Sequence, residues 1–218
     1  EYEDVYFYFD QFCTGVDFST GEAQFRNERS GEYITVAAQP LIACDGASSA
    51  VRMEMQKVGR FNLSQSYLEH GYKELSIPAG SGGYFQIEKT ALHIWPRHTF
   101  MLIALPNLDG SFTCTLFLPF NGKHSFAGLS SQNKVNRFFK EQFPDAFTLM
   151  PTLEEEFFGK PTGSLVTIKC FPWHLADKAL LLGDAAHAIV PFYGQGMNCA
   201  FEDCTLLNSY IEKYGPEW

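Results

Sequence analysis

LLLGDAAHAIVPFYGQGMN, residues 180–198, is the stretch that decides the fold. It begins in an apolar strand over 179–182, turns at Gly183-Asp184, and reaches Gly194-Gln195-Gly196 at the start of a helix predicted to end near Tyr214. Glycine lets the backbone approach a ligand closely, and free N–H groups at a helix start favour negative charge. Strand, tight turn and glycine-lined helix start together predict an α/β core that holds a ligand at this edge.

The predicted helix carries apolar side chains at helical spacing, which we expect to form its buried face. They are Met197, Ala200, Phe201, Cys204, Leu207 and Ile211. The alternative for the whole stretch is a buried strand and helix joined by a glycine-rich loop, with no ligand.

A second strand-to-turn unit lies nearer the start of the chain, where LIAC (41–44) leads directly into DGASSAVR (45–52). Gly46 permits a sharp turn, and Ser48 or Ser49 can cap a following helix whose first turn carries Arg52. The motif is interpreted as a phosphate-binding edge, with a plain turn as the alternative. Upstream, the runs 5–9, 24–26 and 33–37 predict a small antiparallel meander.

The middle of the chain predicts long strands at 92–95, 100–105 and 112–118. Pro96-Arg97-His98 separates the first two, and Asn107 to Gly110 is a hairpin signal. A helix is predicted over 131–143, where Pro144 stops it.

The strand over 100–105 is apolar on both of its faces. A period of two places Met101, Ile103 and Leu105 on one face and Leu102 and Ala104 on the other. Both faces of such a sheet must be covered, one by protein and the other by protein or by a ligand.

Composition excludes several classes of function. The chain is 45% hydrophobic, 16% aromatic and 19% charged, which predicts a substantial core, and its net charge of −9 disfavours a nucleic-acid partner. Its six cysteines show no CxxC pair and no zinc-ligand spacing, so reduced thiols and no metal are expected. No apolar run is long enough to cross a bilayer, so the segment itself is expected to be soluble.

Taken together, the motifs resemble those of the single-component FAD-dependent aromatic hydroxylases. DGASSAVR matches their DGxxSxxR element, and residues 180–198 with Asp203 match GDAAHxxxPxxGxGxN. Within that family, Leu92 to Phe120 and FEDC (201–204) are similar to the members that hydroxylate L-kynurenine. The resemblance implies an α/β (α+β) fold, in which a Rossmann-like FAD-binding core carries a mostly antiparallel β-sheet substrate lobe. Residues 1–57 and 161–218 should belong to the core and 58–160 to the lobe.

The resemblance also implies an activity. It is a flavoprotein monooxygenase reaction that uses NADPH, O2 and a C4a-hydroperoxide of FAD to convert L-kynurenine to 3-hydroxykynurenine, in tryptophan degradation and NAD biosynthesis. The parent protein is expected on the cytosolic face of the mitochondrial outer membrane, anchored by a C-terminal region absent from this chain. The GxGxxG loop is absent too, so the chain is interpreted as a central fragment, inactive alone. Alternatives are another FAD-dependent aromatic hydroxylase or epoxidase, or a non-catalytic flavin-binding fragment.

Site residues follow from the same resemblance. The expected cofactor-binding residues are Asp45, Gly46, Arg52, Gly183, Asp184, Pro191, Gly194, Gln195, Gly196, Met197 and Asn198. The expected substrate-binding residues are Leu92, Met101, Ile103, Leu105, Phe117, Pro191, Phe192 and Gln195. For the apolar ones, ordinary core packing is the alternative. No residue is assigned as catalytic, and His93 and His187 are interpreted as structural.

Overall fold

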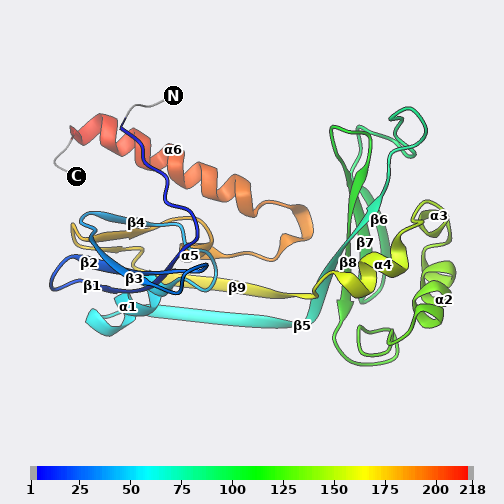
Figure 1. Cartoon of the computed structure of the whole chain (residues 1–218), viewed down its shortest axis with the longest axis horizontal. Coiled ribbons are helices and arrows are strands. Elements are labelled where there is room, and N and C mark those ends of the chain that lie inside the picture. Colours follow the sequence, from blue (N-terminus) through cyan, green and yellow to red (C-terminus); the bar gives the residue numbers. More distant parts are fainter. Residues whose placement is uncertain (1–3, 216–218) are drawn as a thin grey trace. The chain divides into compact units, whose positions relative to one another are not determined.

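The computed structural model describes residues 4–215, which form two compact units (Figure 1). Unit 1 takes its residues from 1–66 and 166–218, and unit 2 is 67–165. The sequence placed these divisions at 57/58 and 160/161. The two units divide within β5 (Asn62–Ile77), after Ser66, and within β9 (Gly163–Phe171), after Leu165.

Unit 1 contains an antiparallel meander of β1 (Gln11–Asp17), β2 (Glu22–Asn27) and β3 (Tyr33–Ala37), in that order. The predicted strands over 24–26 and 33–37 are confirmed. The predicted strand over 5–9 is wrong, because these residues pair with no strand and β1 begins only at Gln11. An aromatic run has a high strand propensity, but it becomes a strand only where a neighbour accepts its ladder hydrogen bonds.

A second, three-stranded sheet in unit 1 has the order β10 (His174–Leu175), β11 (Ala179–Leu181), β4 (Leu41–Ala43). β11 and β4 run parallel, with Leu180 opposite Ile42. The predicted apolar strands before both motifs are therefore confirmed, and they are direct neighbours. This adjacency brings the ends of two strands that are far apart in the sequence to one edge of the sheet.

Helices complete unit 1. They are α1 (Ala50–Val58), α5 (Asp184–His187), the 3-10 turn η1 (Pro191–Tyr193) and α6 (Gly196–Tyr214). Side chains from α1, α5 and both sheets share one core, made of Val16, Phe18, Ala23, Ala43, Val51, Met55, Ala179, Leu181, Ala185 and Ala186. The core thus lies directly beneath the two turns that carry the motifs.

The extent of α6 is confirmed, but its predicted buried face is wrong. No residue of this helix is buried, and Met197 and Phe201 are 67% and 62% exposed. Ala200, Leu207 and Ile211 are only half-buried. Helical spacing predicts which side chains share a face, whereas burial needs an element to cover that face.

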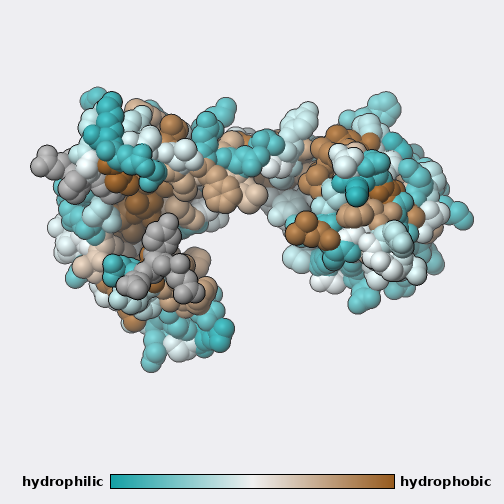
Figure 2. Space-filling view, turned by 90° about the horizontal axis from the view of Figure 1, so that it is seen from above, coloured by the Kyte–Doolittle hydropathy of each residue, from teal (hydrophilic) through white to brown (hydrophobic). Residues whose placement is uncertain are grey.

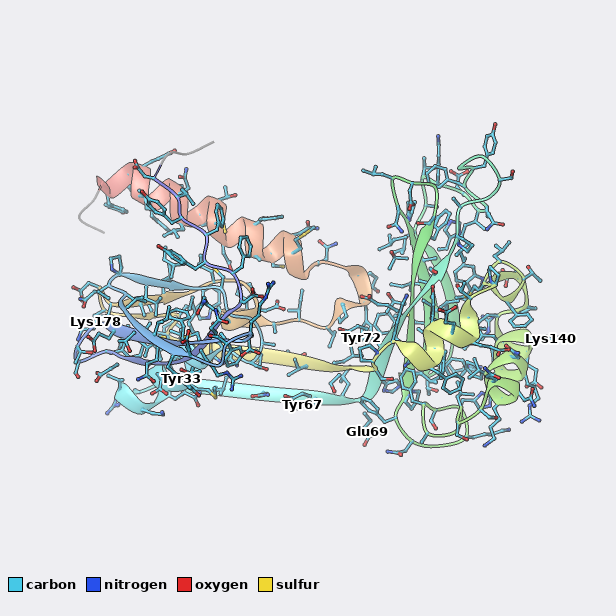
Figure 3. The ribbon with its side chains drawn as sticks, in the orientation of Figure 1. Tyr33, Tyr67, Glu69, Tyr72, Lys140 and Lys178 are labelled. Carbon is cyan, nitrogen blue, oxygen red and sulfur yellow. The ribbon has the colours of Figure 1, made fainter. Side chains whose placement is uncertain are left out.

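Other hydrophobic side chains of unit 1 also reach the molecular surface, as Figure 2 shows. Tyr33, labelled on β3 in Figure 3, is 64% exposed, and every residue of that strand is exposed.

Unit 2 contains β6 (His93–Arg97), β7 (Phe100–Pro106), β8 (Phe112–Pro119) and parts of β5 and β9, which form a five-stranded sheet of order β6-β7-β8-β5-β9. Helices α2 (Gln132–Gln142), α3 (Pro144–Phe147) and α4 (Leu153–Gly159) follow, and they lie on one side of these strands (Figure 1). The predicted strands and the helix over 131–143 are confirmed. Leu102, Ala104, Leu116, Val135 and Phe139 are among the buried residues of the core that the sheet and helices share.

The predicted break at Pro96-Arg97-His98 is only partly right. β6 runs through Pro96 and Arg97, and the turn falls at His98, which has a φ of 54°. β6 is the edge strand of the sheet, where a residue without an N–H is tolerated because only one side of the strand needs ladder hydrogen bonds. The hairpin predicted at Asn107 to Gly110 is confirmed, with Gly110 N–H donating to the Asn107 carbonyl at 3.2 Å.

Candidate functional site

The turn after β11 lies directly against α6. Gly183 has a φ of 58°, and a Cβ built on it would lie 3.0 Å from the Cβ of Ala200. Its backbone N–H donates to Oδ2 of Asp203 at 2.7 Å. Glycine is needed here for both its conformation and its lack of a side chain.

The same carboxylate oxygen of Asp203 also binds His187. Nε2 of His187 lies 2.7 Å from Oδ2 of Asp203, and the imidazole packs against the indole of Trp173 with ring centroids 5.0 Å apart. The half-buried thiol of Cys170 donates to the carbonyl of Ala186 at 3.0 Å, and burial raises the pKa of this thiol. His187 therefore takes part in the contacts that hold the turn.

The start of α6 presents free backbone donors next to a carboxylate. The first helical bond at this end runs from Cys199 N–H to the Gln195 carbonyl at 3.0 Å, so the N–H groups of 196–198 precede the helical ladder. A Cβ built on Gly196 would lie 3.8 Å from Oδ1 of Asp184, whose side chain is exposed. An acceptor and the positive end of a helix thus lie side by side.

The first motif forms the turn between β4 and α1. Ser49 is the N-cap of α1, as one of the two sequence alternatives predicted, and its Oγ accepts from Arg52 N–H at 2.9 Å. Asp45 Oδ2 accepts from Val51 N–H at 3.2 Å. Both residues stabilise the start of α1.

Arg52 connects the two motifs. Its side chain is 2% exposed, and its guanidinium donates to the carbonyl oxygens of Ala47 and Ala185, the latter at 2.7 Å. One carbonyl belongs to the turn after β4 and the other to α5. The structure therefore brings all eleven expected cofactor residues into unit 1, on the turns after two adjacent parallel strands, on α1, on η1 and at the start of α6.

The residues expected to bind FAD have a chemistry that fits a flavin. Asp184 offers an exposed carboxylate to a hydroxyl of a ribityl chain, and the N–H groups at the start of α6 favour developing negative charge. A side chain at Gly196 would fill the space beside Asp184, which glycine leaves open. Pro191, Tyr193 and Gln195 are exposed nearby in sequence and Phe192 is half-buried, so flat and polar surfaces are both available to a ring.

In unit 2, the expected substrate residues on β7 and β8 share one face. Met101 pairs with Phe117, and Ile103 pairs with Ile94 and Thr115. Leu102 and Ala104 point to the opposite side, into the core under the helices. Leu105 is 44% exposed and Leu92, just before β6, is 39% exposed, whereas Ile103 and Phe117 are 5% and 2% exposed.

Sequence reasoning overlooked the polar neighbours of this face. Thr113 and Thr115 alternate with Phe117 along β8, and Glu74 of β5 pairs with Thr115. The same period of two that selected Met101 would have found both threonines. His93 lies on the other face, where its ring packs against Phe112 with centroids 5.7 Å apart.

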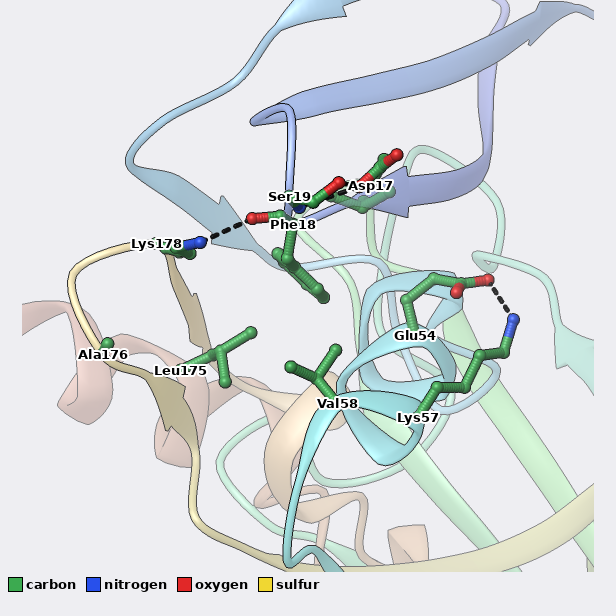
Figure 4. A pocket seen from close by; sticks show the side chains of 10 residues that line it. Asp17, Phe18, Ser19, Glu54, Lys57, Val58, Leu175, Ala176 and Lys178 are labelled. Atoms are coloured by element: carbon green, nitrogen blue, oxygen red, sulfur yellow. Dashed lines mark hydrogen bonds and ion pairs between the residues drawn. The ribbon is translucent and has the colours of Figure 1, made fainter.

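A separate pocket of about 570 Å³ in unit 1 contains none of the expected site residues (Figure 4). Its walls include Val16, Phe18 and Leu175. Its charged groups already have protein partners, since Lys57 pairs with Glu54 at 2.7 Å and Lys178 donates to the Phe18 carbonyl at 2.6 Å. We assign this pocket no ligand.

Residues 4–215, which the structure describes, hold neither a candidate membrane-spanning helix nor a candidate metal cluster. No helix among them is both long and apolar enough to cross a bilayer. Within the same part of the chain, no group of three or more His, Cys, Asp or Glu side chains is arranged to hold a metal ion.

Comparison with known proteins gives one family match and several close relatives. Residues 152–213 match the model of a family described as FAD binding domain. The chain is 51% identical to kynurenine 3-monooxygenase of Flavobacterium psychrophilum, over 97% of this chain and 47% of that protein. It is 54% identical to kynurenine 3-monooxygenase of Myxococcus xanthus (96% and 45% covered) and of Dictyostelium discoideum (97% and 45%). The chain spans about half the length of the curated relatives it matches.

Solved structures support the fold. The tetrameric form of 2-methyl-3-hydroxypyridine-5-carboxylic acid oxygenase matches with a TM-score of 0.67 and 22% identity, over 94% of this chain and 52% of that one. The tetracycline destructase Tet(51) matches with a TM-score of 0.56 and 15% identity, over 95% and 53%. The mixed α/β architecture with antiparallel sheets is thus the one expected from the sequence.

Proposed function

We propose, from the premise that this chain has the FAD-dependent aromatic hydroxylase fold and resembles the kynurenine 3-monooxygenases, that it is the central part of a flavin monooxygenase acting on L-kynurenine. The observation that carries the proposal is the placement of Asp184 beside Gly196 at the start of α6. A carboxylate next to free helix N–H groups suits a ligand that has both hydroxyl groups and a ring that becomes negatively charged.

The residues of unit 1 are proposed to bind FAD. Asp184 accepts a hydrogen bond from a ribityl hydroxyl, and the segment 194–198 faces the isoalloxazine. Asp45, Gly46 and Arg52 lie toward the pyrophosphate, with Arg52 acting through the carbonyls that it binds. When bound, FAD would supply the redox chemistry, in which NADPH provides two electrons, one oxygen atom of O2 enters the substrate ring and the other leaves as water.

The apolar face of unit 2 is proposed to bind the aromatic ring of L-kynurenine. Met101, Ile103 and Leu105 point to the side of the sheet that does not carry the helical core. Leu92 and Phe117 extend the same surface, and Pro191, Phe192 and Gln195 are assigned to the flavin side. An apolar surface orients a ring and excludes water from the position where oxygen is transferred.

By the same resemblance, we place the full-length protein at the cytosolic face of the mitochondrial outer membrane, held there by a C-terminal hydrophobic segment. Fractionation of cells that express the full-length protein, with and without that segment, tests this location.

The decisive experiment uses the full-length protein with FAD, NADPH and a panel of aromatic compounds. We expect NADPH oxidation that depends on L-kynurenine and formation of 3-hydroxykynurenine, detected by mass spectrometry. Turnover of another aromatic compound instead would favour a different hydroxylase or epoxidase of this fold. If the protein binds FAD and is yellow, but NADPH does not reduce the flavin, the result would favour a non-catalytic flavin-binding protein.

A matched pair of variants tests the assignment of Asp184. Asp184→Ala should weaken FAD binding about tenfold or more, because a hydrogen bond to a charged acceptor is lost. Asp177→Ala removes another exposed carboxylate, from the turn before β11, and should leave FAD affinity unchanged. Equal FAD affinity in the two variants would remove Asp184 from the flavin site.

A further inference from the structure

We infer that Asp203 is a positioning residue of the flavin site, whose carboxylate fixes the register between the turn after β11 and α6. This inference rests on the proposed function and deepens it, because it names what holds Asp184 beside the start of the helix. Asp203 itself is not assigned any contact with the cofactor.

The contacts between the turn and α6 form a regular stripe. Gly196, Ala200 and Asp203 are spaced at i, i+4 and i+7, which places them on one face of the helix. Gly196 lies beside Asp184, and Ala200 lies against Gly183. Asp203 accepts hydrogen bonds at the end of this stripe. Each of the three stripe residues therefore contacts part of the segment 183–187.

Asp203 makes the strongest of the contacts between the turn and α6. Its Oδ2 lies 2.7 Å from both Gly183 N and His187 Nε2, and its side chain is only 12% exposed. Hydrogen bonds to a charged acceptor are shorter and stronger than those between neutral groups. A single carboxylate oxygen thus joins the first residue of the turn to the last residue of α5.

Within the described residues, 4–215, apolar packing alone does not hold α6 in this register. None of its residues is buried, and Met197 and Phe201 are mostly exposed. A helix that slid or rotated on a surface of this kind would lose little apolar burial. It would lose the two hydrogen bonds of Asp203, and the relation between Asp184 and the helix start would change with them.

The imidazole of His187 is itself held in place. Its ring packs on Trp173, whose Nε1 donates to the Cys170 carbonyl at 2.8 Å. The position of His187 is therefore determined by β9, by Trp173 in the connection between β9 and β10, and by α6. This arrangement favours a supporting role for His187 over an acid–base role.

The test uses the full-length protein and three variants. Asp203→Ala removes both hydrogen bonds, and Asp203→Asn keeps one oxygen that can accept. Glu202→Ala is the control, because Glu202 is the neighbouring residue of α6, has the same charge and is exposed. FAD affinity is measured by flavin fluorescence, and hydrogen exchange of the peptide over 180–187 is measured by mass spectrometry on the apoprotein.

We expect Asp203→Ala to weaken FAD binding about 10- to 100-fold, with Asp203→Asn recovering a large part of the loss. We expect exchange over 180–187 in the apoprotein to become at least about tenfold faster in Asp203→Ala, because the turn opens more often. Glu202→Ala should change neither quantity by more than about twofold.

The outcomes separate this inference from the proposed function. If the unaltered protein binds no FAD, the proposed function fails, and the exchange measurement still decides whether Asp203 holds the turn. If the protein binds FAD but Asp203→Ala and Glu202→Ala have equal affinity, the inference is overturned. If Asp203→Ala does not fold, the test is made with Asp203→Asn. A positioning role is contradicted if this variant binds FAD with full affinity while its peptide over 180–187 exchanges without protection.

Discussion

Nη1 of Arg52 lies 2.7 Å from the carbonyl oxygen of Ala185, so a hydrogen bond joins two motifs whose bonded residues are 133 positions apart in the chain. The same guanidinium also donates to the carbonyl of Ala47. Arg52 is 2% exposed, and its planar group can hold two carbonyls at fixed positions. The turn after β4 and the turn after β11 are thereby held as one surface.

Arg52→Met should lower the free energy of unfolding by about 2–4 kcal/mol, because two backbone carbonyls lose their donor. FAD affinity should fall in the same variant, since both turns shift. Denaturant unfolding and flavin fluorescence of the full-length protein measure the two effects. Lys57→Met on the same helix is the control. Its ion pair with Glu54 is solvent-exposed, so a change within about 1 kcal/mol is expected; equal losses in both variants would contradict the role given to Arg52.

Leu102 and Leu105 of β7 should respond in opposite ways to truncation. Leu102 is fully buried in the core under the helices, so Leu102→Ala should cost about 2–5 kcal/mol of stability. Leu105 is 44% exposed on the other side of the sheet, so Leu105→Ala should cost less than about 1 kcal/mol. It should raise the KM for L-kynurenine about tenfold. An unchanged KM would remove Leu105 from the substrate surface.

The buried thiol of Cys114 should make stability depend on pH in the alkaline range. Burial, with a smaller contribution from the charge of Glu156, raises the pKa of Cys114 from 9.0 to about 12. Above pH 9 the unfolded chain loses this proton while the folded chain keeps it, so rising pH favours unfolding. The free energy of unfolding of the unaltered protein, relative to that of Cys114→Ala, should fall by about 1.4 kcal/mol per pH unit between pH 9 and 12. Unfolding curves at several pH values measure it, and a constant difference would contradict the assignment.

The hairpin at Gly110 should not tolerate a side chain. A Cβ there would lie 2.4 Å from the carbonyl oxygen of Gly83, and the φ of Gly110 is 88°. Gly122 of the same unit also has a positive φ, 115°, but has open space around its Cβ position. Gly110→Ala should therefore lose about 1–3 kcal/mol more stability than Gly122→Ala, because it adds a collision with backbone to the conformational strain. Equal losses by thermal unfolding would show that the collision is relieved without cost.

Local patterns were sufficient for most of the secondary structure. The period of two assigned Leu102 and Leu105 to opposite faces of one strand, and a serine placed before α1 was the expected cap. These predictions depend on neighbours within a few residues. The strand predicted over 5–9 and the buried face of α6 were wrong because both depend on a partner element, and a single segment does not reveal whether it has one.

The sequence by itself determined that the chain has two strand-to-turn motifs of flavoprotein type, and that Asp184 and Gly196 stand at the turn and at the helix start. Only the tertiary structure decided that β4 and β11 are parallel neighbours, that Arg52 joins the motifs, and that Asp203 binds both Gly183 and His187. The physical reason is the range of the interactions. Backbone propensity, capping and periodicity act over one or two turns of chain, whereas these hydrogen bonds join residues from 16 to 133 positions apart and exist only once the core beneath them has formed.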